Sequence, residues 1–91
     1  MYTIWKYELW RGLTTHIIPR DAVALTAQLQ DTSLVIWMQV EDTAPPVETQ
    51  FVVLATGQPF PAMLVPKDIR YINTVQHSGL VWHVFQVVQV R

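Results

Sequence analysis

The last segment of the chain raises the main question about its fold. Within residues 80–90 only His83, Gln86 and Gln89 interrupt a run of apolar side chains. A strand with one face buried and the other in water alternates apolar and polar residues. This strand would instead carry Leu80, Trp82, Val84, Val88 and Val90 on one face and Val81, Phe85 and Val87 on the other. Both faces are apolar, so something must cover the second one.

Alternation elsewhere in the chain also predicts strands. In residues 3–9, Trp5, Tyr7 and Leu9 share one face, and Lys6 and Glu8 share the other. The same reading places Val23, Leu25, Ala27 and Leu29 in one inward row. The expected strands are residues 3–9, 14–18, 23–29, 34–40, 51–56, 71–76 and 80–90.

Turn-forming residues separate these segments. Residues 19–21 and 77–79 are expected turns, 30–33 a hairpin connection, and 41–49 a polar loop that contains two prolines. Residues 57–68 hold one glycine and three prolines, which predicts an ordered but irregular excursion. Residues 21–30 could instead form a helix capped by Asp21, and 68–74 are a weaker helical option. We therefore expect a small antiparallel sandwich or barrel of about seven strands with at most one short helix.

Composition makes the uncovered face more significant. The chain has 91 residues, which is enough for one domain, residues 1–91. It is 51% hydrophobic and only 14% charged, against about 25% charged in ordinary domains. A small domain has a large surface for its volume and should need more polar residues, so the excess predicts burial against another copy or another protein. We expect a homo-oligomer with Val81, Phe85 and Val87 in the interface.

Several classes of partner and location are disfavoured. The net charge is −1 with no basic stripe, so nucleic-acid binding is not expected. The absence of cysteine excludes disulfides and thiol chemistry. No apolar stretch reaches the roughly 18 residues of a spanning helix, and the N-terminus lacks the pattern of a signal peptide. The expected location is the cytoplasm, with no membrane partner.

No residue pattern indicates catalysis. The three histidines, His16, His77 and His83, match no zinc-ligand spacing. Most carboxylates fall in expected loops, and neither Ser33 nor Ser78 lies in a nucleophile motif. There is no glycine-rich phosphate loop. We expect a protein that is not an enzyme, with no catalytic residue, no metal site and no cofactor.

A set of ring-bearing and polar residues suits a ligand instead. A purine ligand would need rings for stacking, amides for the base edge and a cation for phosphate. The same rings also suit ordinary core packing. For Phe60, the competing interpretation is that its ring fills the open end of a barrel. The candidate ligand-binding residues are Gln58, Phe60, Arg70, Tyr71, Asn73 and His83.

Four segments resemble a known family. TIWKYEL (residues 3–9), TGQPFP (56–61), YINTVQ (71–76) and LVWHVF (80–85) are similar to small proteins of tailed bacteriophages that form a domain-of-unknown-function group. Its members read T-I-W-K-Y, G-T-G-x-P-I-P, Y-I-G-T-x-Q and L-V-F-H-V-F. Asn73 stands where a glycine is usual, Ala55 replaces the first glycine, and residues 86–91 extend past the usual end. Asn73 in place of glycine predicts a regular strand without positive φ. The resemblance implies a phage origin and one all-β unit, and it implies no activity.

These observations together predict a non-enzymatic phage accessory protein in the cytoplasm of the infected bacterium. As a homo-oligomer it would sequester a small nucleotide-like signalling molecule of a host defence system in pockets between subunits. The alternative is a protein that binds and inhibits a host defence or nucleic-acid enzyme. A third option is a component of the virion or of its assembly.

Overall fold

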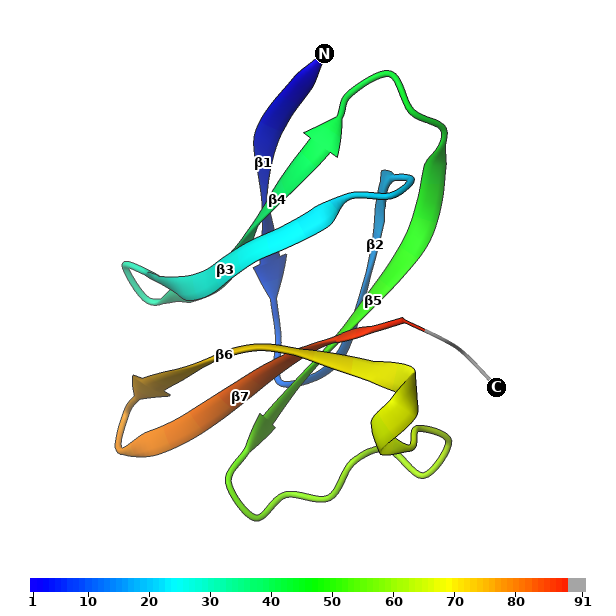
Figure 1. Ribbon diagram of the computed structural model, residues 1–91. Helices are drawn as coiled ribbons and strands as arrows, with labels where there is room; N and C mark the ends of the chain where they lie inside the picture. The colour runs from blue at the N-terminus through cyan, green and yellow to red at the C-terminus, as the bar shows by residue number, and fades with distance from the viewer. Residues whose placement is uncertain (89–91) are drawn as a thin grey trace.

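The computed structural model describes residues 1–88 and shows an all-β fold of two antiparallel sheets (Figure 1). Within these residues there are seven strands, and one 3-10 turn, η1 (Pro66–Asp68), is the helical element. Both predicted helical alternatives are wrong, because residues 23–30 and 69–77 are strands. The strands are β1 (Tyr2–Leu9), β2 (Gly12–Pro19), β3 (Val23–Gln30), β4 (Ser33–Glu41), β5 (Pro46–Ala55), β6 (Ile69–His77) and β7 (Leu80–Val87).

The sheets have the orders β1-β4-β3 and β2-β5-β7-β6, and they face each other across the core. Two tight hairpins form where the sequence predicted them. Gln30 pairs with Ser33 and His77 pairs with Leu80, so each turn has two central residues. Ser78 and Gly79 have φ values of 54° and 77°, which is the conformation that a type I′ turn requires.

The core between the sheets is apolar. Apolar residues from both sheets meet there and have almost no exposed surface. The burial of their apolar surface is the main stabilising term in a domain of this size. Its fully buried side chains include Ile18, Ile36, Met38, Val40, Phe51 and Val84. The predicted placement of Val84 on the buried face of the last strand is confirmed.

Side chains join the edge strands of the two sheets. On one side, the Asn73 amide of β6 accepts the Ala27 N–H of β3 at 2.9 Å and donates to the Ala27 carbonyl at 2.6 Å. On the other side, His16 of β2 donates from Nε2 to the Glu8 carbonyl of β1 at 2.6 Å, since a carbonyl can only accept. The sandwich is thus closed along both sides by side-chain-to-backbone hydrogen bonds.

The second face of β7 is covered by the chain itself. A second apolar cluster lies outside the sheet, where Leu64 of the segment 57–68 packs over Val52, Leu54 and Val87. Val87 is 8% exposed, and Phe85 is half-buried against this cluster. Within one copy the irregular segment thus covers much of Val87, and the interface expected at Val81, Phe85 and Val87 stays a prediction. Val81 is half-buried, and residue Val90 lies outside the described residues.

Two strands differ from their predicted form. A bulge between Ala24 and Thr26 shifts the alternation of β3, so Val23 and Leu25 are exposed while Ala24, Ala27 and Leu29 face inward. Asn73 also follows a bulge, so the predicted regular strand there is wrong, although its φ is not positive.

The polar loop is shorter than predicted. β5 begins at Pro46, which pairs with Pro19, and not near Phe51. The pairing places Pro46–Gln50 opposite the end of β2, where residues of a loop had been expected. The polar residues Glu48, Thr49 and Gln50 therefore belong to a paired strand and not to a loop. This first half of β5 is more exposed than its second half.

Candidate binding sites

Three of the six predicted ligand residues line one pocket on the outer face of the second sheet. Gln58, Phe60 and His83 border a cavity of about 210 Å³ beside the end of β5. The turn that follows β5 is fixed locally, because the Gln58 side-chain oxygen and backbone N–H bond the Ala55 N–H and carbonyl. We call this cavity the outer pocket.

His83 is held in the outer pocket by two threonine hydroxyls. Its Nε2 lies 2.7 Å from Thr56 Oγ1, and its Nδ1 lies 3.1 Å from Thr74 Oγ1. Thr74 also bonds the Tyr71 hydroxyl at 2.6 Å. Each hydroxyl can donate or accept, so this chain fixes the orientation of the imidazole without fixing its tautomer.

The aromatic rings of the outer pocket pack edge to face. The Phe85 ring lies 5.2 Å from Phe60 and 5.7 Å from Tyr71, with interplanar angles of 65° and 61°. Phe60 remains 40% exposed, so its ring is only partly committed to packing. Tyr71 thus lies next to the outer pocket through Phe85 and Thr74.

Arg70 and Asn73 lie elsewhere. Arg70 borders a separate hollow near Asp21, Glu48 and Gln86, and the Asn73 amide is used in the contact with Ala27. The outer pocket therefore has rings and hydroxyls but lacks the cation that was predicted to hold a phosphate. The structure does not bring the six residues together as one site.

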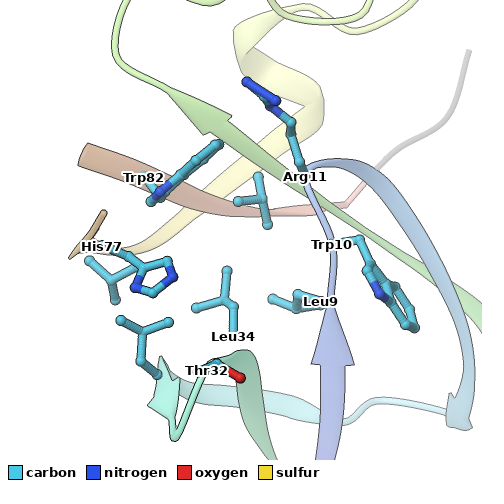
Figure 2. A pocket seen from close by; sticks show the side chains of 10 residues that line it. Leu9, Trp10, Arg11, Thr32, Leu34, His77 and Trp82 are labelled. Atoms are coloured by element: carbon cyan, nitrogen blue, oxygen red, sulfur yellow. The ribbon is translucent and has the colours of Figure 1, made fainter. Parts of the chain in front are cut away.

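A second pocket opens between the two sheets, and Figure 2 shows it from close by. Its volume is about 200 Å³. Leu9 closes one side of it, and the β3-β4 and β6-β7 hairpins supply Thr32 and His77. We call this cavity the inner pocket. Its apolar lining consists of Leu9, Trp10, Leu29, Leu34, Val53, Val75 and Trp82.

Arg11 gives the inner pocket its charge. Its Cζ atom lies 5.3 Å from the centre of the Trp82 ring, and Figure 2 shows the two side chains next to each other. Such a cation–π contact holds the guanidinium while leaving its N–H donors available. Within residues 1–88 no carboxylate lies within ion-pair distance of Arg11.

The bend at Trp10 and Arg11 fixes where this charge lies. Thr14 Oγ1, which is buried, accepts the Trp10 N–H at 3.0 Å. Gly12 follows with a φ of 83°, a conformation that glycine adopts without strain. The Trp10 ring stacks on His16 at 6.0 Å. The bend is thus held by local contacts on both sides of Arg11.

The outer pocket has part of the geometry of a nucleophile and its base. The Thr56 hydroxyl lies within hydrogen-bond distance of His83, as in hydrolases with a hydroxyl nucleophile. The group that orients His83, however, is the hydroxyl of Thr74 and not a carboxylate as in a catalytic triad. In the described part of the chain no three metal-ligating residues gather.

The groups with shifted pKa values lie outside both pockets. Burial raises the pKa of Tyr7, and the Met1 ammonium and Thr43 lower the pKa of Glu41 to about 2. Neither residue lines the inner or the outer pocket.

Sequence reasoning missed the inner pocket because its residues are distant in the chain. From the sequence, Arg11 and Gly12 are typical of a bend, His77 belongs to an expected turn, and Trp10 is not readily assigned to the core. The available signal was an aromatic residue and an arginine at the exposed end of a strand, residue types that are enriched in binding surfaces. Only the packing of the two sheets against each other brings these residues and Trp82 around one pocket.

Comparison with known proteins places the chain in a family without indicating an activity. Residues 1–91 match the model of a domain of unknown function (DUF7352), and the chain belongs to that family. No curated protein and no solved structure matches it. No helix among residues 1–88 is long and apolar enough to span a membrane.

Proposed function

We propose that this domain is a non-enzymatic protein-binding module, and that its partner inserts a side chain into the inner pocket. The observation that carries this proposal is the size and rim of that pocket. A volume of about 200 Å³ is below the roughly 300–1,000 Å³ of pockets that enclose whole small molecules. It is suited to one apolar side chain.

The residues at the rim support a protein partner. Tryptophan and arginine are enriched among the residues that contribute most to protein–protein binding. Here Trp10, Arg11 and Trp82 border the inner pocket, and Trp10 is 56% exposed. A rim of this kind around a one-residue cavity is typical of a site that receives an anchor side chain.

A second candidate is the sequestration of a nucleotide-like molecule. It is favoured by the outer pocket, which does bring Gln58, Phe60 and His83 together. At about 210 Å³ that pocket also holds less than a whole nucleotide, so a second copy of the chain would have to complete it. This candidate therefore requires a homo-oligomer, while the protein-binding proposal does not.

The biological setting rests on the resemblance to phage proteins. We place the domain in the cytoplasm of an infected bacterium, where it would bind and inhibit a host defence or nucleic-acid enzyme. A role in the virion or its assembly is the remaining option. The family supports an uncharacterised domain, and the phage setting is our proposal.

Quantitative capture from bacterial lysate tests the proposal. Wild-type protein, Arg11→Gln and a pocket-blocking Thr32→Tyr variant serve as baits, and Arg20→Gln is the matched control because Arg20 is exposed and lines neither pocket. We expect a protein that is enriched about equally by wild type and Arg20→Gln. Its recovery should fall at least severalfold with Arg11→Gln and Thr32→Tyr.

Identical profiles from all four baits would contradict binding through the inner pocket. The second candidate is tested separately by calorimetric titration with cyclic nucleotides and cyclic ADP-ribose isomers, with native mass spectrometry to weigh the assembly. Saturable binding that is lost in Phe60→Ala, together with a defined oligomer, would favour sequestration instead.

A further inference from the structure

The inner pocket combines an apolar interior with one charged group at its edge. The interior is formed by aliphatic side chains from both sheets, among them Leu9, Leu34 and Val53. An apolar group that enters it is stabilised in proportion to the apolar surface that is removed from water. The pocket alone would therefore accept many apolar side chains without distinguishing what lies next to them.

Arg11 can distinguish between partners by the group that lies next to the inserted apolar side chain. Its contact with Trp82 at 5.3 Å positions the guanidinium beside the cavity, and within residues 1–88 no acid neutralises it. His77, from the β6-β7 hairpin, adds a second group that can donate a hydrogen bond. A carboxylate is the group that best complements an arginine, because its two oxygens match the guanidinium N–H donors.

Resting on the proposed protein-binding function, we propose that the inner pocket recognises an apolar side chain followed by an acidic residue in a partner protein. The apolar side chain fills the cavity, and the acid pairs with Arg11. Both hairpins at the pocket edge are tight two-residue turns, so the recognition surface is formed in advance. The cavity supplies most of the affinity, and the charge pair supplies the selectivity.

Short peptides test this inference directly by NMR titration of the full-length 15N-labelled chain. The probes are acetyl-Gly-Leu-Asp-Gly-amide, the same peptide with Asn in place of Asp, and the same peptide with Gly in place of Leu. The indole N–H signals of Trp10 and Trp82 report on the inner pocket, and those of Trp5 and Trp37, which do not line it, are internal controls. Signal dispersion confirms that each variant is folded.

We expect millimolar binding of the Leu-Asp peptide that moves the Trp10 and Trp82 signals and weakens with added salt. The Asn peptide should bind about threefold more weakly, which is the range of an exposed ion pair, and the Gly peptide weaker still. Arg11→Gln should remove the difference between the Asp and Asn peptides, whereas Arg20→Gln should keep it.

The failure of this inference is distinguishable from the failure of the proposed function. Equal binding of the Asp and Asn peptides would overturn the acidic preference and leave an apolar anchor site. Shifts confined to Trp5 or Trp37 would overturn the location. If none of the peptides moves any signal while the lysate capture still depends on Arg11, the acidic-motif inference is wrong and the protein-binding proposal stands.

Discussion

The edge strands β3 and β6 belong to different sheets and are not paired through their backbones. The Asn73 side chain joins them instead. Its amide both accepts from and donates to the backbone of Ala27, which is the pattern that a paired residue of a neighbouring strand would offer. Ala27 is fully buried, so its N–H and carbonyl would have no water to replace these bonds. One side chain thus closes one side of the sandwich.

Replacing Asn73 by alanine should therefore destabilise the fold by about 1–3 kcal/mol, the cost of leaving buried backbone groups unpaired. The measurement is urea denaturation. Gln76→Ala is the matched control, because Gln76 lies exposed on the same strand and should change stability by no more than about 0.5 kcal/mol. Equal stabilities of the two variants would mean that Asn73 does not hold the sheets together.

Glu41, the last residue of β4, links the stability of the fold to pH through its contact with Met1. The hydrogen bond from the Met1 ammonium, followed by those from Thr43, lowers the pKa of Glu41 to about 2 from an unperturbed 4.5. A carboxylate whose folded pKa is depressed favours the folded state above its unfolded pKa. That contribution is lost as the pH falls from about 4.5 towards 2.

We expect wild-type protein with Met1 as its first residue to lose more stability than Glu41→Gln when the pH falls from 6 to 3. Because the carboxylate is exposed, 0.5 M salt should reduce the difference. Urea denaturation at both pH values measures it. Parallel pH profiles of the two proteins would show that the contact with Met1 contributes nothing in solution.

At the scale of elements, the segment 57–68 explains the apolar outer face of β7. Leu64 packs over the strand pair β5-β7. The end of the segment is fixed by two hydrogen bonds at η1: the Asp68 side chain accepts the Val65 N–H, and the Asp68 carbonyl accepts the Val88 N–H. The chain therefore covers its own second face with an irregular segment, which a strand pattern cannot reveal.

Changing Val87 to aspartate should consequently unfold the domain and not merely separate copies of it. A carboxylate beneath Leu64 would be buried without a partner, at a cost of several kcal/mol. Val88→Asp is the matched control, because Val88 is 46% exposed. Circular dichroism and sedimentation should show loss of fold for the first variant only. A folded but dissociated Val87→Asp protein would instead place Val87 in an interface between copies.

The number and type of the strands were predictable because alternation and turn chemistry act locally. The hairpins at Asp31 and Ser78 show this, since both residues adopt the positive φ that their turns need. The bulges in β3 and β6 were not predictable, because each depends on pairing with a distant strand. Half of the predicted ligand residues lie in one pocket. Arg70 lines another hollow, because neighbouring residues of a strand point to opposite faces of the sheet and Tyr71 faces the outer pocket.

At the scale of the whole molecule, the apolar excess remains on the surface even though the chain covers β7. Its accessible area is 5696 Å², close to the roughly 5,400 Å² of an average monomer of this mass. Yet large apolar side chains are exposed on both sheets and at the bend, among them Ile4, Trp10 and Ile17 at 57%, 56% and 59%. A contiguous apolar patch would mark a binding surface, and the proposed partner would cover part of this exposed apolar area.

The measurement that tests the central claim most directly is the NMR footprint of a captured partner on the 15N-labelled domain. Binding through the inner pocket predicts that the largest shifts occur at Trp10, Arg11, Thr32, His77 and Trp82. The signals of Phe60, Tyr71 and His83 around the outer pocket should stay in place. A footprint centred on the outer pocket, with the Trp82 indole unmoved, would contradict the account.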